Sequence, residues 1–261
     1  MKSLIIANWK MNPVNKEEAI NIFEGIKKQI PTLKNTEVVI CPPFIFLPLL
    51  DSSEQIKLGS QDCFCEEKGA FTGEVSPHQI KHLGEYVIIG HSERRINLKE
   101  TDELINKKII TALLSGLRVI LCVGGKLQKN KKSKKPWCDV DCQNLKEVEK
   151  QLKKDLKGAK DLINQNLFVA YEPIGAISTN PGAKALQPEE VKVGVIFIEN
   201  ALKQIFKKEK AKEIKILYGG SVNSENAKDI IAKSGVSGLL VGSASLKPEE
   251  FGKLVRSVDL L

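Results

Sequence analysis

Three side chains that can move protons or hold a fixed charge each follow a short apolar run. They are Lys10 in "NWKMN", His91 in "GHSERR" and Glu172 in "AYEPIGAISTN". An apolar setting raises the pKa of a carboxylate toward the range of a general base, so Glu172 could abstract a proton. A helix beginning after His91 would disfavour a protonated imidazole and leave a neutral hydrogen-bond donor. Lys10 would add a fixed positive charge.

Each of these residues also has an ordinary structural explanation. Glu172 could be the acid of a surface ion pair, and His91 could be a core histidine with satisfied hydrogen bonds. Lys10 could pair with Glu93 for purely structural reasons. Taken singly, these residues do not decide between an enzyme and a stable scaffold.

Two glycine-containing motifs near the end of the chain point to an anion site. They are "YGGS", which ends at Ser221, and "VGSAS", which contains Gly242 and Ser243. Small residues at strand-to-helix turns let backbone N–H groups approach an anion such as phosphate. Together with a base, a neutral donor and a cation, a phosphate cradle suits proton abstraction next to the carbonyl of a small phosphorylated substrate. The sequence shows no metal-ligand cluster and no dinucleotide-binding loop.

Eight apolar, β-branched runs supply the elements that would position these groups. They span residues 4–10, 37–43, 56–62, 86–92, 118–125, 167–173, 214–221 and 238–245. Continuous rather than alternating apolar runs are typical of parallel strands buried on both faces. Helical patterns lie between them, as in "EEAINIFEGIKKQI". This alternation predicts a single (β/α)8 barrel, with an open doubly wound sheet as the alternative.

The polar residues singled out above stand at the carboxyl ends of these runs, which converge on one face of a barrel. Buried polar groups cost free energy unless they are paired, so packing alone does not explain this pattern. The pattern therefore favours an enzyme with its active site at that face.

Composition narrows the class of protein further. The chain has 261 residues, of which 42% are hydrophobic, and a net charge of +8. No apolar run approaches the roughly 20 residues of a membrane span, and the N-terminus resembles no signal peptide, so we expect a cytoplasmic protein without a membrane partner. The six cysteines form no C-x-x-C pair, and reduced thiols are expected.

One dense basic cluster, "KLQKNKKSKKP", occupies residues 126–136. It carries no interleaved aromatic residues, which favours a solvated loop over a nucleic-acid or acidic-partner site. We therefore expect one barrel domain over 1–261, with a basic insertion at about 126–142 and no nucleic-acid partner.

Six motifs, taken in order, closely resemble triosephosphate isomerase: "NWKMN", "GAFTGEVS", "GHSERR", "AYEPI", "YGGSV" and "VGSASL". The likeness runs through nearly the whole chain. It implies a TIM barrel that interconverts dihydroxyacetone phosphate and D-glyceraldehyde 3-phosphate through an enediol(ate), in glycolysis and gluconeogenesis, with no cofactor. Members of this family are known for pairing a glutamate base with a neutral histidine and a closing loop.

The resemblance also implies roles for individual residues. It matches Glu172 to the base, His91 to the electrophile and proton relay, Lys10 to the charge-stabilising cation with Asn8 beside it, and Glu93 to the acid of the "HSE" motif. It places Ser178, Ser221, Gly242 and Ser243 at the family's phosphate-binding backbone. Residues 69–74, with Thr72 near the tip, match a loop that reaches into a partner subunit and so imply a homodimer.

Several positions depart from the family pattern. Gly175 stands where the family usually has Trp, and Gly125 where it usually has Glu. Ser178, Asn180 and Ser243 each replace a usual glycine. These changes concern the lid and the phosphate site rather than the base, the electrophile or the cation. They leave open a non-catalytic or weakly active phosphate-binding barrel with a binding role, and a different phosphate-binding barrel enzyme.

Overall fold

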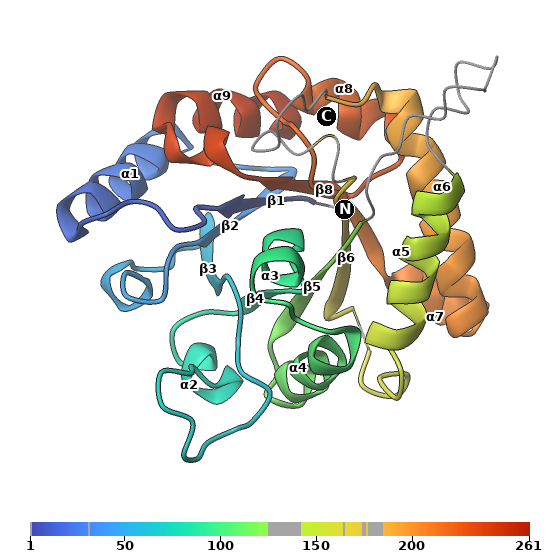
Figure 1. The fold of residues 1–261 in the computed structure, drawn as a ribbon. Coiled ribbons are helices and arrows are strands. Elements are labelled where there is room, and N and C mark those ends of the chain that lie inside the picture. Colours follow the sequence, from blue (N-terminus) through green and yellow to red (C-terminus); the bar gives the residue numbers. More distant parts are fainter. Residues whose placement is uncertain (1, 31, 125–141, 164, 174–175, 177–184) are drawn as a thin grey trace.

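The computed structural model describes the chain except for residues 1, 31, 125–141, 164, 174, 175 and 177–184. Eight parallel strands form a closed barrel in chain order (Figure 1). They are β1 (Ser3–Asn8), β2 (Thr36–Cys41), β3 (Ile56–Ser60), β4 (Tyr86–Ile89), β5 (Arg118–Val123), β6 (Leu167–Tyr171), β7 (Lys215–Tyr218) and β8 (Gly238–Val241). The first strand pairs with both β2 and β8, which confirms the barrel and excludes the open sheet.

Helices surround this barrel (Figure 1). The described part contains α1 (Lys16–Gln29), η1 (Leu47–Leu49), α2 (Pro77–Lys81), α3 (Ser92–Asn97), α4 (Asp102–Leu114), α5 (Cys142–Asp155), α6 (Pro188–Ile205), α7 (Lys208–Glu213), α8 (Ala227–Ser234), η3 (Ser243–Leu246) and α9 (Pro248–Asp259). Local sequence sets several of the starts. The Asn15 side chain caps α1, and Thr101 caps α4 by accepting from the Leu104 N–H. No helix in this part is long and apolar enough to cross a membrane.

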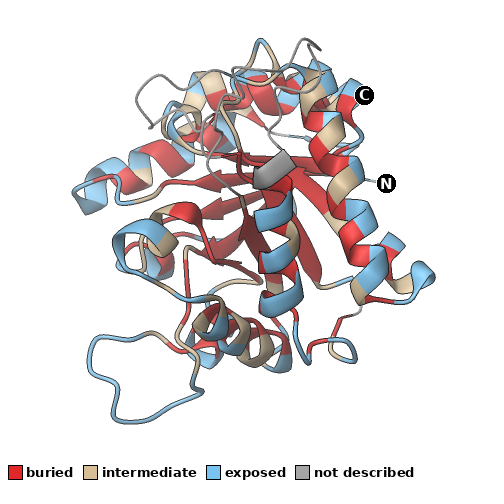
Figure 2. Cartoon of the chain, turned by 45° about the vertical axis from the view of Figure 1, so that its right-hand side comes forward, coloured by how far each residue is buried: buried red, intermediate tan, exposed pale blue. Residues whose placement is uncertain are grey.

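The strands are apolar on both sides because both sides are buried (Figure 2). Leu4 and Ile6 belong to the cluster that fills the barrel interior, whereas Ile5 and Ala7 face the layer beneath the helices. This arrangement explains why the runs are continuous rather than alternating. Tyr86 lies at 0% exposure in the interior cluster, and the Arg118 guanidinium stacks 4.5 Å above its ring centroid.

Every predicted run overlaps a strand and extends past its carboxyl end. The pairing stops where the chain turns away toward the next helix, and the polar residues follow that point. His91 and Glu172 therefore lie just beyond β4 and β6, on the face where all eight parallel strands end. The basic segment lies outside the described residues except for Cys142, where α5 begins.

A group of four charges, three of them buried, ties the end of β3 to α3 and α4. The Lys108 ammonium lies 2.7 Å from Asp62 Oδ2 and 2.6 Å from Glu100 Oε1. The Arg94 guanidinium lies 2.8 Å from each of the same two oxygens. The other oxygen of each carboxylate, Asp62 Oδ1 and Glu100 Oε2, has no hydrogen-bond partner among the described residues. Two acids thus share two cations while each keeps one buried oxygen unsatisfied.

This arrangement sets the protonation of Asp62. Burial raises its pKa from 3.8 to about 6, against the attraction of Lys108. The folded chain therefore holds this proton more tightly than the unfolded chain does. The stability that the bound proton contributes is fully present at pH values below the pKa of Asp62 in the unfolded chain. It is lost as the pH rises through the pKa of Asp62 in the folded chain.

We predict that Asp62→Asn gains stability relative to the wild type as the pH rises from about 4 to about 7, because asparagine has no proton to lose. The free energy of unfolding of the variant, minus that of the wild type, should increase by about 1–3 kcal/mol over this range. Urea titrations at several pH values measure it, and a pH-independent difference would contradict the prediction.

Asp259→Asn is a matched control of opposite sign. Burial opposes ionisation of Asp259, but the backbone N–H groups of Lys34 and Asn35 outweigh it and lower its pKa. The stability that this carboxylate contributes is therefore present above the unfolded pKa and lost as the pH falls through the folded one. The cost of Asp259→Asn should shrink on acidification.

Candidate active site

Glu172 lies directly after β6 and is 2% exposed. Its backbone N–H donates to the Val123 carbonyl at 2.8 Å, which continues the β5–β6 pairing by one residue. A Cβ at Gly219 would lie 3.0 Å from Glu172 Cγ, so the glycine at the end of β7 makes room for the side chain. The strand ends thus bury a carboxylate at the mouth of the barrel.

The Glu172 carboxylate contacts the start of α3 through both of its oxygens. Oε1 lies 3.1 Å from His91 Nε2, and Oε2 accepts the Ser92 backbone N–H at 3.1 Å. His91 caps α3, and its Nδ1 accepts the Glu93 backbone N–H at 3.2 Å. A ring nitrogen that accepts a hydrogen bond carries no proton, so this network assigns the imidazole proton to Nε2. The helix start therefore orients His91 as an Nε2–H donor aimed at the carboxylate.

The pKa values of this pair reflect the contact more than the burial. Burial lowers the pKa of His91, but the Glu172 carboxylate outweighs this and raises it. Burial raises the pKa of Glu172, but His91 and the Ser92 N–H outweigh this and lower it. The expectation of a raised Glu172 pKa is therefore wrong for this arrangement. The sequence could not show that a histidine lies against the carboxylate.

Lys10 follows β1 with a φ of 54°, in the left-handed region, and its Nζ lies 2.5 Å from Glu93 Oε1. The Asn8 side chain accepts the Lys10 backbone N–H at 3.0 Å, and Gln61 donates to the Lys10 carbonyl at 2.8 Å. The structural ion pair weighed from the sequence is therefore present. It also fixes the cation beside the His91–Glu172 pair.

These residues border a common space. A cavity of about 240 Å³ is lined in part by Asn8, Lys10, Gln61, His91 and Glu93. The structure therefore brings together the five residues proposed for catalysis. Four of them line this cavity, and Glu172 contacts His91, which is one of the four. A small polar molecule would meet a cation, an imidazole N–H and a buried carboxylate within one site.

The expected phosphate site is only partly formed. A Cβ at Gly242 would lie 3.6 Å from Lys10 Cε, so the β8 turn lies beside the cation. Ser221 and Ser243 line a neighbouring cavity of about 400 Å³. However, the Ser221 backbone N–H and hydroxyl both donate to the Ala176 carbonyl, at 2.7 and 2.8 Å. In this arrangement the Ala176 carbonyl, which follows Gly175 in the expected closing loop, accepts both of the hydrogen bonds that Ser221 would offer to a phosphate.

The remaining lid positions, Gly175, Ser178 and Asn180, lie outside the described residues, as does Gly125. Cys41, Cys63, Cys65 and Cys122 are free thiols. Among the residues described, no group of three or more His, Cys, Asp or Glu side chains could hold a metal ion.

A closed (β/α)8 barrel with a carboxylate, a histidine and a lysine at its strand ends has the architecture of a barrel enzyme. The sequence profile of the family described as triosephosphate isomerase matches residues 3–258. The chain belongs to the triosephosphate isomerase family and is an isomerase of the barrel class.

Curated relatives agree over nearly full length. A triosephosphate isomerase of Aquifex aeolicus is 43% identical over 263 residues, which cover 98% of this chain and all of the relative. One from Thermoanaerobacter pseudethanolicus is 41% identical over 258 residues, covering 97% and 98%. One from Dehalococcoides mccartyi is 40% identical over 266 residues, covering 100% and 98%.

Two residues that shape the site received no role from the sequence. Gln61 holds the Lys10 carbonyl and also donates to the Cys41 carbonyl at 2.9 Å. The feature of the sequence that could have identified Gln61 was its position directly after β3. Arg95 binds the Gly90 carbonyl, immediately before His91, at 2.7 Å. The position of Arg95 within "GHSERR" indicated that it lies near the histidine but did not indicate its role.

We predict that Glu93→Gln lowers kcat/KM by about 10- to 100-fold, because Lys10 loses the charge that fixes it beside the reacting atoms. Steady-state assays with glyceraldehyde 3-phosphate measure this. Glu85→Gln is the matched control, since Glu85 is similarly exposed and pairs with Lys57 at 3.4 Å away from the site. The control should stay within about twofold of the wild type. Equal losses in both variants would show that the Lys10–Glu93 pair has no special role.

Proposed function

We propose that this chain interconverts dihydroxyacetone phosphate and D-glyceraldehyde 3-phosphate without a cofactor. The observation that carries the proposal is the buried contact of Glu172 Oε1 with His91 Nε2 at 3.1 Å, with Lys10 at the adjoining cavity. A base, a neutral donor and a fixed cation are the groups that proton transfer next to a carbonyl requires. In this proposal the protein acts in the cytoplasm, in glycolysis and gluconeogenesis.

The reaction would proceed in two proton transfers. Glu172 takes a proton from C1 of dihydroxyacetone phosphate, and the electron pair moves through the new C1–C2 double bond onto the C2 oxygen. His91 Nε2–H donates to that oxygen and passes protons between the two oxygens of the enediolate. Lys10 stabilises the negative charge. Glu172 then returns its proton to C2, which yields D-glyceraldehyde 3-phosphate.

The contact between Glu172 and His91 has a consequence for this cycle. A substrate carbonyl that binds His91 must take the place of the Glu172 oxygen at Nε2. Separation would remove the interaction that lowers the pKa of Glu172 and raises that of His91. Substrate binding itself would therefore make Glu172 a stronger base and keep His91 a neutral donor.

Phosphate binding would require a second exchange. We propose that the backbone of Gly242 and Ser243 and the Ser221 N–H hold the phosphate, together with Ser178. The Ser221 N–H must first leave the Ala176 carbonyl. This exchange would couple arrival of the phosphate to movement of the lid and thereby to exclusion of water.

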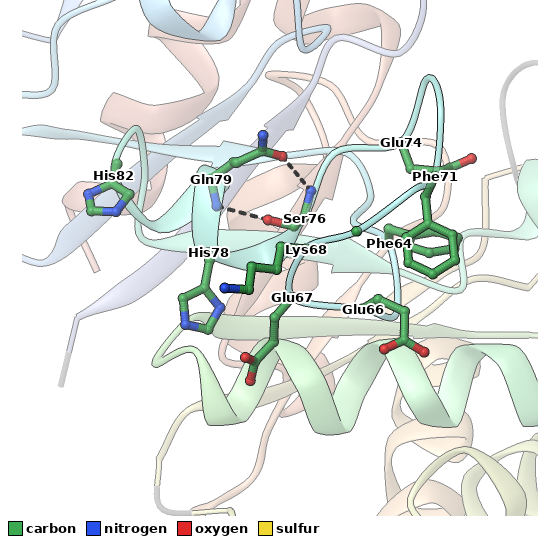
Figure 3. Close-up of a pocket in the computed structure, with 11 residues that line it drawn as sticks. Phe64, Glu66, Glu67, Lys68, Phe71, Glu74, Ser76, His78, Gln79 and His82 are labelled. Carbon is green, nitrogen blue, oxygen red and sulfur yellow. Dashed lines mark hydrogen bonds between the residues drawn. The ribbon is translucent and has the colours of Figure 1, made fainter.

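A homodimer is the second part of the proposal. The segment between β3 and α2 projects from the barrel (Figure 1), and Phe71 on it is 44% exposed. A cavity of about 660 Å³ lies between this segment and α2, with Phe64 and Phe71 in contact at one end (Figure 3). Met11 and Ile45 are exposed at 91% and 71%. A second copy is the partner that we propose for residues 69–74 and these apolar side chains.

We predict that Glu172→Gln lowers kcat by at least a few hundred-fold without loss of folding, because the amide cannot accept the substrate proton. Turnover of glyceraldehyde 3-phosphate and a thermal melt measure the two properties. Glu190→Gln is the control, since Glu190 caps α6 by accepting from the Gln187 N–H. Near-wild-type turnover of Glu172→Gln would remove the mechanism.

Light scattering at micromolar concentration should give about twice the 28.9 kDa chain mass. Phe71→Ser should shift the equilibrium toward monomer and reduce activity, because it removes the apolar side chain that a partner would bury. Ile196→Ser, on α6 with 49% exposure, should leave the mass unchanged. A fully active wild-type monomer would rule out the dimer as a requirement.

A further inference from the structure

Arg95 connects four elements below the active site. Its Nε donates to the Gly90 carbonyl at 2.7 Å, and Nη2 donates to the Cys122 carbonyl at 3.1 Å. Nη1 lies 2.9 Å from Asp102 on α4, and Nη2 lies 2.6 Å from Asp155 on α5. One planar guanidinium therefore joins the ends of β4 and β5 to two helices.

Both carbonyls belong to residues that adjoin the reacting pair. Gly90 immediately precedes His91. Cys122 precedes Val123, whose carbonyl accepts the Glu172 N–H, and the Cys122 thiol itself is close enough for Glu172 to raise its pKa, in addition to the effect of burial. Because β4, β5 and β6 are neighbours in the barrel, a cross-link between the first two sets the lateral spacing of the strand ends that carry His91 and Glu172.

The backbone is shaped for this approach. Gly90 has a φ of +74°, and a Cβ there would lie 2.8 Å from Arg95 Nη2. A side chain at this position would push the guanidinium away from the two carbonyls. The left-handed turn before His91 thus both aims the histidine and admits the arginine.

Asp155 holds Arg95 in place at a high cost. Its side chain is fully buried at the end of α5, and Oδ1 has no hydrogen-bond partner among the described residues. Burial raises its pKa to about 7, against the attraction of Arg95, while Asp102 adds to the rise and Lys154 opposes it. A buried ion pair with an unsatisfied oxygen contributes little net stability. Stability is therefore a poor explanation for this carboxylate.

We propose that Asp155 is a positioning residue for the isomerase reaction, acting through Arg95. By fixing the guanidinium beneath the Gly90 and Cys122 carbonyls, it sets the separation of His91 and Glu172 that proton transfer requires. The proposal rests on the function proposed above. None of the described side chains of α5 lines the catalytic cavity, yet the proposal gives this helix an influence on the rate of the chemical step.

The test is Asp155→Asn in the full-length chain. Asparagine keeps the shape but loses the charge, so the guanidinium can turn toward Asp102 and withdraw from the carbonyls. We expect kcat to fall about 5- to 20-fold, since a misplacement of about 1 Å at the reacting atoms can cost about 100-fold. KM should stay within about twofold, because no phosphate-binding group moves.

Asp259→Asn is the matched control. This carboxylate also links distant segments, since it accepts the backbone N–H groups of Lys34 and Asn35, but it does so at the opposite end of the barrel. It should lower the melting temperature and leave kcat within about twofold of the wild type. If Asp155 had only a structural role, Asp155→Asn would likewise lower the melting temperature and leave kcat within about twofold. That result would overturn the proposal.

A double-mutant cycle gives the second readout. Arg95→Lys keeps the positive charge but loses the planar fork, so it should lower kcat by itself. In the Arg95→Lys background, Asp155→Asn should then cause almost no further loss of kcat, because its effect passes through Arg95. Additive losses would overturn the proposal. If Asp155→Asn yields no folded protein, Arg95→Lys with wild-type kcat would overturn it equally.

The outcomes separate this proposal from the one on which it rests. An active Glu172→Gln variant would refute the assigned reaction mechanism whatever Asp155 does. An inactive Glu172→Gln variant together with an Asp155→Asn variant of wild-type kcat would refute only the positioning role.

Discussion

Closure of the barrel is the constraint on which the rest of the structure depends. The first strand pairs with β8 as well as β2, so no strand edge is left open and all eight carboxyl ends surround one face. Lys10 and Glu172, which lie far apart in the chain, are thereby brought to the same site. Each strand needs only to end at the right place, because parallel closure supplies the convergence. The chemical groups can then sit on short turns held by a rigid sheet.

Several charged side chains lie at the mouth of this barrel, and each of those named here is paired. Glu172 meets His91 and a helix N–H, Lys10 meets Glu93, and Arg95 meets two carboxylates. Pairing keeps the desolvation cost tolerable, but the partners are not equally satisfied. Asp62 and Asp155 keep buried oxygens without a described partner, and their pKa values rise toward neutrality. Asp62 directly follows Gln61, which lines the cavity of the site, and Asp155 binds Arg95, which holds the carbonyl before His91.

Under the proposed mechanism, the contacts at the site describe a state that changes when substrate binds. Glu172 is bonded to the histidine that would polarise the substrate, and Ser221 to the lid carbonyl at Ala176. A phosphorylated substrate would replace both interactions with its own oxygens. Binding energy from the phosphate would then be coupled to the pKa values of the reacting pair, which is how remote contacts assist chemistry at a distance.

The sequence by itself determined the eight strands, their parallel order and the residues at their ends. Continuous apolar runs indicate strands buried on both faces, and polar residues at strand ends are hard to explain by packing. Both signals lie within a few neighbouring residues, so they can be read from the sequence. The motifs around Lys10, His91 and Glu172 identified the family for the same reason.

Only the tertiary structure decided how these groups act on one another. Four features depend on how the folded chain places its turns and helices. They are the lowered pKa of Glu172, the proton on His91 Nε2, the hydrogen bonds from Ser221 to Ala176 and the ion pair of Arg95 with Asp155. Electrostatic interactions and hydrogen bonds depend on distances of a few ångströms, which residue order does not encode until the barrel closes.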